Sequence, residues 1–153
     1  MSNDFSIKVE GTEEIIAALK RLGAEATDIA TDATMAGAEI ARAEAANKAA
    51  QTSQRLADGM LKELDTTKSD EVVVKVGPNK DLFWSRVVEF GAEPHHATPD
   101  QAKALQTDLD QFAANANHPG VEARPFLRPA ADATASAVQA EIARQLKKRL
   151  NLE

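Results

Sequence analysis

The chain has 153 residues, a length that suits one domain with enough interior for a real core. Its 24 acidic and 18 basic residues give a formal net charge of −6, which argues against a protein that binds DNA tightly through its phosphates. The absence of cysteine excludes disulfides and cysteine-ligated zinc, and no apolar run approaches the roughly 20 residues of a membrane span, so we expect a soluble, unprocessed protein.

The first third of the chain predicts a strand and two helices. Apolar and polar residues alternate over residues 5–9, which indicates a half-buried strand, and residues 12–22 show helical spacing before Gly23. A long alanine-rich helix is predicted over residues 24–51, and its small residues indicate close packing against another helix or a neighbouring subunit. We expect its main face to carry Ile29, Ala33, Ala36, Ile40, Ala43, Asn47 and Ala50.

The middle of the chain predicts short elements. Residues 55–64 favour a short helix, and the alternating valines of residues 72–76 favour a strand that ends at Gly77. Residues 81–90 have helical spacing, with a second strand as the alternative, and Gly91 suits a helix C-cap.

The last third predicts two loops and two helices. Residues 94–96 and 115–120 are expected to be loops, and the capping residues at 98–101 favour a helix with Ala102, Leu105, Leu109 and Phe112 on one side. Residues 129–150 predict a final helix with an apolar stripe of Ala131, Ala135, Val138, Ile142, Leu146 and Leu150. The sequence therefore predicts one α+β domain over residues 1–153, a small antiparallel or mixed sheet packed with a long alanine-rich helix and a C-terminal helix.

The residues that carry enzyme chemistry form no recognisable constellation. The chain lacks a glycine-rich phosphate loop, a nucleophile elbow and a histidine pair at helical spacing. His95 and His96 are adjacent and point in different directions, whereas zinc needs three or four converging ligands. We therefore expect no enzyme activity, no cofactor and no metal, with a metal-dependent hydrolase that uses His95, His96 and nearby acids as a remote alternative.

Two motifs combine bulky apolar residues with residues that fix the backbone. The first is Val-Val-Glu-Phe-Gly at residues 87–91, and the second is Arg-Pro-Phe-Leu-Arg-Pro-Ala at residues 124–130. In motif 124–130 the two prolines favour an extended Phe126 and Leu127, and Pro129 suits the beginning of a helix. We expect Phe90 and Phe126 to pack on each other or on a shared core, with Glu89 braced by Arg124 or Arg128. The alternative is that Glu89 points outward and binds a basic group on the next subunit.

These motifs resemble those of the tail-completion or neck proteins of lambdoid long-tailed bacteriophages. The valine strand that ends in Val-Gly-Pro at residues 76–78 and the Pro-Phe-Leu-Arg-Pro-Ala run carry the resemblance, together with Glu-Phe-Gly at residues 89–91. The chain departs from the family pattern at residues 52–56, which lack the glycine of Thr-Gly-x-Leu, and at Ala92, where threonine is usual. Residues 93–122 are longer than the expected connection and are interpreted as an inserted helical loop.

The resemblance implies a structural virion protein of the head–tail junction that is assembled in the host cytoplasm. Such a protein is expected to form a ring, of hexameric symmetry, that completes the tail and joins it to the head connector while DNA passes through the lumen. Its implied partners are a tail terminator or tail tube protein and a head connector or stopper protein, with no membrane. The interface or signature residues are Trp84, Glu89, Phe90, Gly91, Arg124, Pro125, Phe126, Leu127, Arg128 and Pro129.

Two further interpretations stay open at this point. Trp84 with Phe83 is either an interface anchor or a plug in the core of a chain that has few aromatic residues. The alternative function is a small DNA-binding or packaging accessory protein, for which the basic run at residues 144–149 is the nearest candidate.

Overall fold

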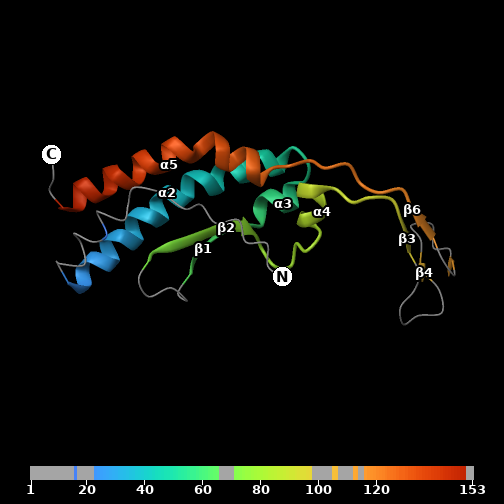
Figure 1. The fold of residues 1–153 in the computed structure, drawn as a ribbon, viewed down its shortest axis with the longest axis horizontal. Helices are drawn as coiled ribbons and strands as arrows, with labels where there is room; N and C mark the ends of the chain where they lie inside the picture. Colours follow the sequence, from blue (N-terminus) through green and yellow to red (C-terminus); the bar gives the residue numbers. More distant parts are fainter. Residues whose placement is uncertain are drawn as a thin grey trace. The chain divides into compact units, whose positions relative to one another are not determined.

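The computed structural model describes residue 16 and residues 23–65, 71–97, 105–106, 112–113 and 116–150. The chain divides into two compact units: unit 1 comprises residues 1–83 and 126–153, and unit 2 comprises residues 84–125 (Figure 1). Ile16 is helical, and the rest of the predicted strand and helix at residues 5–22 lies outside the described residues.

Two long helices form the frame of unit 1. Helix α2 (Ala24–Ala50) and helix α5 (Leu127–Leu150) lie side by side and run in opposite directions (Figure 1). Near one end Arg149 pairs with Asp32, and further along the pair Gly37 faces Ile142. A Cβ atom at Gly37 would lie 2.7 Å from Ile142 Cγ1, so the helices approach at this point as closely as glycine allows. This confirms both predicted helices and the close packing expected from the small residues.

The buried face of α2 differs from the predicted one. The buried residues are Ala26, Ala30, Ala33, Gly37, Ala38, Ala41, Ala45 and Ala49, so Ala33 alone is shared with the prediction. Ile29, Ala36 and Ile40 are half-buried, and Ala43, Asn47 and Ala50 are exposed. The prediction followed the largest apolar side chains, whereas the closest part of a helix contact admits only the smallest ones.

The buried stripe of α5 is half as predicted. Val138, Ile142 and Leu146 are buried as expected, but the stripe continues through Thr134 and Ala130. Ala131 and Leu150 are half-buried and Ala135 is exposed. Thr134 tolerates burial because its hydroxyl donates a 2.8 Å hydrogen bond to the carbonyl of Ala130. The predicted apolar stripe therefore missed Thr134 because this residue is polar although it is buried.

A two-stranded antiparallel sheet completes the described core of unit 1. Helix α3 (Gln54–Asp58) precedes strand β1 (Met60–Asp65), which pairs with β2 (Val73–Pro78). The predicted helix at residues 55–64 is thus wrong beyond Asp58. Gly59 ends α3, and its carbonyl accepts a 2.8 Å hydrogen bond from the amide of Asn79 just after β2. The pairing with β2 takes residues 60–65 out of the helix, as tertiary contacts often override local propensity.

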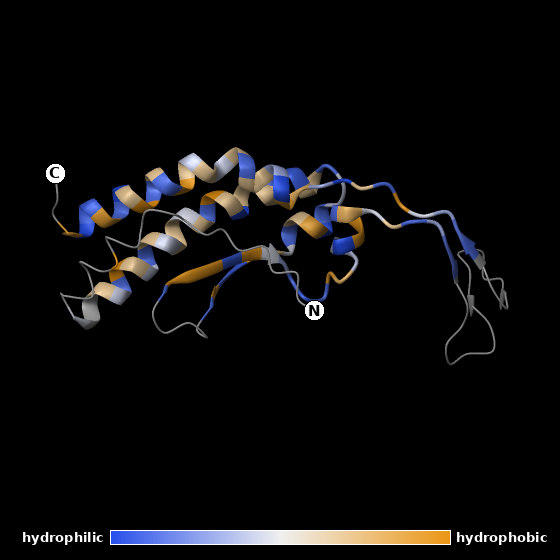
Figure 2. Cartoon of the chain, in the orientation of Figure 1, coloured by the Kyte–Doolittle hydropathy of each residue, from blue (hydrophilic) through white to orange (hydrophobic). Residues whose placement is uncertain are grey.

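The sheet turns one face toward α2. Residues that oppose each other across an antiparallel pair lie on the same face, and Met60, Val74 and Val76 occupy the buried one. In Figure 2 strand β2 is coloured mainly as hydrophobic, in agreement with the predicted valine strand. Helix α2 contacts both strands as well as α5, so it is the centre of unit 1.

The described residues of unit 2 contain one short helix, two short strand pairs and one isolated β-bridge. Helix α4 (Ser85–Phe90) is followed by β3 (His95–Ala97), which pairs with β6 (Ala116–His118), and Ala92 bridges to Val121. We call residues 92–97 and 116–121 the ribbon; its described residues are mostly hydrophilic (Figure 2). Strand β4 (Leu105–Gln106) pairs with β5 (Phe112–Ala113).

Three predictions for residues 93–122 are wrong within the described residues. The expected loops at 94–96 and 115–120 contain paired strands, and the expected helix contains the strand pair β4–β5. The capping residues at 98–101 lie outside the described residues. Local capping signals stabilise a helix end by only about 1 kcal/mol, so they do not outweigh backbone pairing with a distant segment.

Candidate functional site

Motif 87–91 and the first residues of motif 124–130 meet within unit 2. They meet beside the bridge between Ala92 and Val121, which we call the base of the ribbon. Helix α4 ends at Gly91, as predicted, and the amide of Gly91 donates a 2.8 Å hydrogen bond to the carbonyl of Val87. The next residue, Ala92, exchanges hydrogen bonds of 2.9 and 2.8 Å with Val121. The amide of Arg124 then donates a 2.7 Å bond to the carbonyl of Val88. Backbone pairing thus places the start of motif 124–130 beside motif 87–91.

Glycine is required at two points of this base. Gly91 and Gly120 have φ angles of 74° and 87°, in the left-handed region that side chains disfavour. A Cβ atom on Gly91 would lie 2.7 Å from the carbonyl oxygen of Val121, and one on Gly120 would lie 2.5 Å from the carbonyl oxygen of Ala92. Glycine at these two positions therefore allows the two backbones to approach each other closely at the base of the ribbon.

The rest of motif 124–130 lies in unit 1 and begins α5. Phe126 is 2% exposed, and its carbonyl accepts a hydrogen bond from the amide of Ala130, so the helix starts directly after it. The predicted extended conformation of Leu127 is wrong, since Leu127 is the first residue of α5 and Pro129 the third. Proline fits there because amides of the first helical turn have no partner within the helix.

The predicted signature residues differ widely in exposure. Glu89 is 3% exposed and Trp84 is half-buried, whereas Phe90 is 51% exposed. Arg124, Pro125 and Arg128 are exposed. Phe83 is 84% exposed and is therefore not a plug in the core, whereas the packing of Phe90 and Phe126 on a shared core stays a prediction. The brace of Glu89 by an arginine stays a prediction, and the contact that the structure gives Arg124 is made by its backbone amide.

The three histidines lie on the ribbon and do not form a metal site in the described residues. His95 and His118 oppose each other and stack with their ring centroids 4.9 Å apart, and His96 Nδ1 lies 2.7 Å from Asn117 Oδ1. Nδ1 of His118 accepts a hydrogen bond from the amide of Gly120. The part of the chain that the structure describes contains no group of three or more histidine and acidic side chains that converge as metal ligands.

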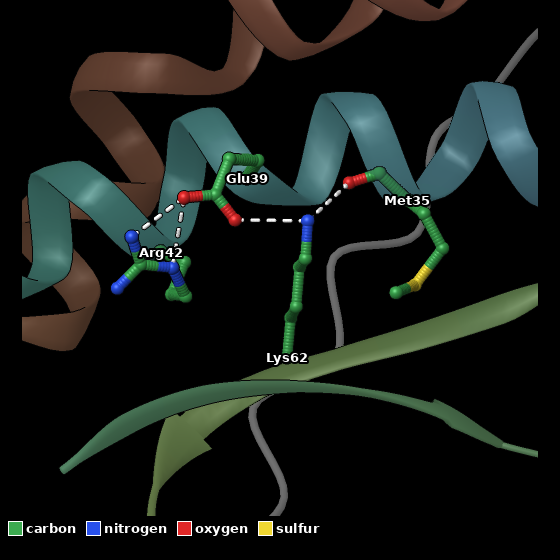
Figure 3. Close-up of polar contacts among 4 residues, drawn as sticks. All are labelled: Met35, Glu39, Arg42 and Lys62. Atoms are coloured by element: carbon green, nitrogen blue, oxygen red, sulfur yellow. Dashed lines mark hydrogen bonds and ion pairs between the residues drawn. The ribbon is translucent and has the colours of Figure 1, made fainter.

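A charged cluster that the sequence analysis missed joins the sheet to α2 (Figure 3). Lys62 Nζ reaches from β1 to the carbonyl of Met35 at 3.2 Å and to Glu39 Oε2 at 2.8 Å. Arg42 Nε donates a 3.0 Å bond to Glu39 Oε1. The hydrogen bonds from Arg42 and Lys62 lower the pKa of Glu39 to about 2, and Glu39 raises the pKa of Arg42. The sequence signal for this cluster was the helical spacing of Glu39 and Arg42, whereas the contribution of Lys62 follows only from the pairing of β1 with β2.

Stability at low pH should depend on Glu39. Its pKa is lowered from 4.5 to about 2 on folding, so its ionised form adds stability above about pH 5 that is lost as the pH falls toward 2. Because the side chain is 44% exposed, we expect at most about 1 kcal/mol. Glu39→Gln should lower the free energy of unfolding by this amount at pH 7, and the difference should shrink between about pH 4.5 and 2 in urea titrations.

The matched control for this prediction is Glu63→Gln on the same strand as Lys62. Glu63 has no ion pair in the described part of the chain, so its variant should unfold like the parent throughout this pH range. A constant difference for Glu39→Gln down to pH 2 would show that its carboxylate is not held by Arg42 and Lys62.

The basic end of α5 is partly neutralised within the chain. Arg144 donates to Glu141, which lowers the pKa of Glu141 to about 2, and Arg149 pairs with Asp32 of α2. In the described residues this leaves Lys147 and Lys148 without an ion pair. Two lysines can neutralise only a few phosphates, which is little for a nucleic-acid interface.

One comparison with known proteins decides the family. A family model described as "Bacteriophage HK97-gp10, putative tail-component" matches residues 13–91, more than half of the 153-residue chain. The chain belongs to this HK97-gp10-like family. It is thus a bacteriophage tail component, and its place is in the virion. Searches of curated proteins and of solved structures give no match.

The matched range covers the central elements of this tail component. It includes α2, the β1–β2 sheet and α4 and ends at Gly91, so it contains the whole of motif 87–91. Motif 124–130 lies beyond it, and its part in the resemblance stays a prediction. None of the helices in the described ranges is long and apolar enough to span a membrane.

Proposed function

We propose that this tail component forms a ring at the head–tail junction, completes the tail there and joins it to the head connector around the DNA channel. The observation that carries the proposal is the family match over residues 13–91. The expected partners are copies of the chain, a tail terminator or tail tube protein, and a head connector or stopper protein. The role is structural and requires no enzyme activity.

The ribbon supports a role in assembly. Residues 93–96 and 117–119 are exposed on both of its strands, and an isolated two-stranded hairpin is only marginally stable in water. A ribbon of this kind gains stability when a neighbouring protein covers it. We therefore propose that residues 93–122 are an insertion that contacts a partner in the particle.

The charge of the chain supports passage of DNA without tight binding. The net charge is −6, and the basic residues at the end of α5 are partly paired with acids. A ring with this balance would repel the phosphates of DNA that moves through its lumen. The accessory DNA-binding protein remains the alternative, and it would show DNA retention that falls steeply as salt is raised.

The proposed ring forms on the particle. Alanine-rich faces bury little apolar area per residue, and association costs about 4–15 kcal/mol of translational and rotational free energy. One contact between two copies therefore does not hold a complex together, whereas a tail end or connector supplies further contacts to each copy. The purified chain should be monomeric or weakly associated, and sixfold symmetry is the expected state of the ring.

Electron microscopy of particles produced without this chain tests the proposed function. We expect DNA-filled heads and separate tails in these preparations, and we expect the wild-type chain supplied in trans to restore joined particles. The matched control is a chain with Asp132→Asn, which should restore joining as the wild type does because this exposed residue of α5 has no ion pair in the described residues. Joined, infectious particles in the absence of the chain would contradict the proposal.

A further inference from the structure

Phe83 is the most exposed large apolar side chain among the described residues. It is 84% exposed, although the whole chain has only five phenylalanines and one tryptophan. Burying a phenylalanine side chain normally stabilises a protein by about 1.5–3 kcal/mol. Phe83 is therefore suited to anchor a partner, because this chain has few aromatic residues and leaves this one exposed to water. We call Phe83 the anchor.

The turn before Phe83 holds this side chain outward. Asn79 Oδ1 accepts a 2.9 Å hydrogen bond from the amide of Asp81, and the carbonyl of Asn79 accepts one of 2.9 Å from the amide of Leu82. Leu82 is 5% exposed and packs on Gly59, where a Cβ atom would lie 2.2 Å from Leu82 Cδ1. Leu82 is thus held in the core of unit 1, and the next residue, Phe83, lies at the surface.

The outer face of the β1–β2 sheet carries a patch that fits an aromatic ring. Leu61 is 41% exposed and lies opposite Gly77, on the face that does not contact α2. Among the described residues other than its chain neighbours, none has an atom within 4 Å of the position of a Cβ atom on Gly77, so they leave the surface beside Leu61 open. Aromatic rings pack well over glycine in a sheet because they cover the exposed backbone.

Two residues of opposite charge accompany Phe83 and the Leu61–Gly77 patch, one close to Phe83 in the sequence and one on the same face of β1 as Leu61. Lys80, three residues before Phe83, has no ion pair in the described part of the chain. Glu63 follows Leu61 on the same face of β1, and the lysine opposite it, Lys75, pairs instead with Asp65 at 3.2 Å. Within the described ranges, the segment that carries Phe83 thus has a cation without an ion pair, and the face that carries Leu61 has a carboxylate without one.

We infer that Phe83 of one copy packs on Leu61 and Gly77 of a second copy, with Lys80 of the first copy beside Glu63 of the second. The anchor and the patch are different surfaces, so the contact is heterologous, and repetition of such a contact gives a ring when the rotation closes. Closure into a ring rests on the proposed function. One phenylalanine on a small patch lies well below the roughly 1,200–2,000 Å² of a stable interface, so the contact is weak until the ring closes.

Sedimentation of the full chain over a range of concentrations tests the anchor. Phe83→Ala should weaken self-association at least about tenfold, whereas Leu64→Ala, a control on an apolar residue of β1 that is 41% exposed, should change it less than about twofold. Lys80→Glu and Glu63→Lys should each weaken association about threefold or more, and the double variant should recover because the ion pair is restored between copies.

Cross-linking tests the geometry, since the chain contains no cysteine. A Phe83→Cys chain mixed with a Leu61→Cys chain should form mixed dimers with a short bis-maleimide. The control mixture of Phe83→Cys with Ala143→Cys, at an exposed position of α5, should not. The same pairs introduced into assembled particles report the contact where purified chains associate too weakly.

Equal cross-linking of the two mixtures, or none from Phe83→Cys and Leu61→Cys in particles, would overturn the inference. A double charge reversal that stays as weak as the single ones would also overturn it. These outcomes differ from a failure of the proposed function, because joined particles without the chain refute its role at the junction and do not affect the contact between copies.

Discussion

Phe126→Ala should lower the free energy of unfolding of the chain by about 3–5 kcal/mol. Phe126 is 2% exposed and is one of the two largest fully buried side chains in the described residues. Removing a buried ring loses its transfer free energy and leaves a cavity that the surrounding helices fill only in part. The free energy of unfolding of a natural domain is about 5–15 kcal/mol in total. Urea unfolding followed by circular dichroism should therefore show a large decrease in the urea concentration at the midpoint.

Phe83→Ala is the matched control for this variant. It removes the same ring from a position that is 84% exposed, so the free energy of unfolding should change by less than about 0.5 kcal/mol. Similar losses for the two variants would mean that Phe126 is not part of the core that anchors the start of α5.

Gly120→Ala should open the ribbon while unit 1 stays folded. The left-handed φ of 87° costs an alanine about 1–3 kcal/mol, and its Cβ atom would lie 2.5 Å from the carbonyl oxygen of Ala92. The bond from the amide of Val121 to that same oxygen must then break, in a ribbon that is marginally stable. Hydrogen exchange of the Val121 amide should become more than about tenfold faster.

Gly23→Ala separates backbone strain from the steric clash. Gly23 has a similar φ of 92°, but no described residue other than its chain neighbours lies within 4 Å of the position of its Cβ atom. This variant should show the strain alone, and the exchange of Val121 should remain as in the parent chain. If Gly23→Ala and Gly120→Ala lower stability equally and leave Val121 protected, the close approach of the two strands at Gly120 is absent in solution.

The helical frame could be predicted from the sequence because its signals are long and local. The long helix was predicted over residues 24–51 and α2 spans Ala24–Ala50, and the valine strand and the Gly91 cap were also predicted. The buried face of α2 could not be predicted from side-chain size. Which side of an alanine-rich helix is closest to α5 depends on contacts such as Gly37 with Ile142, between residues more than 100 positions apart.

The ribbon was missed because its hydrogen bonds join distant segments. The pairing of His95 with His118 has no local signature, and the polar residues around both resemble those of a surface loop. The meeting of motifs 87–91 and 124–130 was expected, but through side chains. The structure brings them together through backbone bonds of Ala92 and Arg124, whose partners cannot be deduced from residue type.

The charged cluster of Lys62, Glu39 and Arg42 shows the same limit. The spacing of Glu39 and Arg42 is a common helical pair, and only the fold adds Lys62 from a strand that lies across α2. Its position on the inward face required knowledge of the register between β1 and β2. Sequence patterns therefore predicted the elements here better than their contacts.

Cryo-electron microscopy of intact particles that contain this chain tests the central claim most directly. The proposal predicts a single ring of copies, each with α2 packed against α5, at the head-proximal end of the tail and around the DNA. Density for the chain along the whole tail tube, at the distal tip, or nowhere in the joined particle would contradict a role at the head–tail junction.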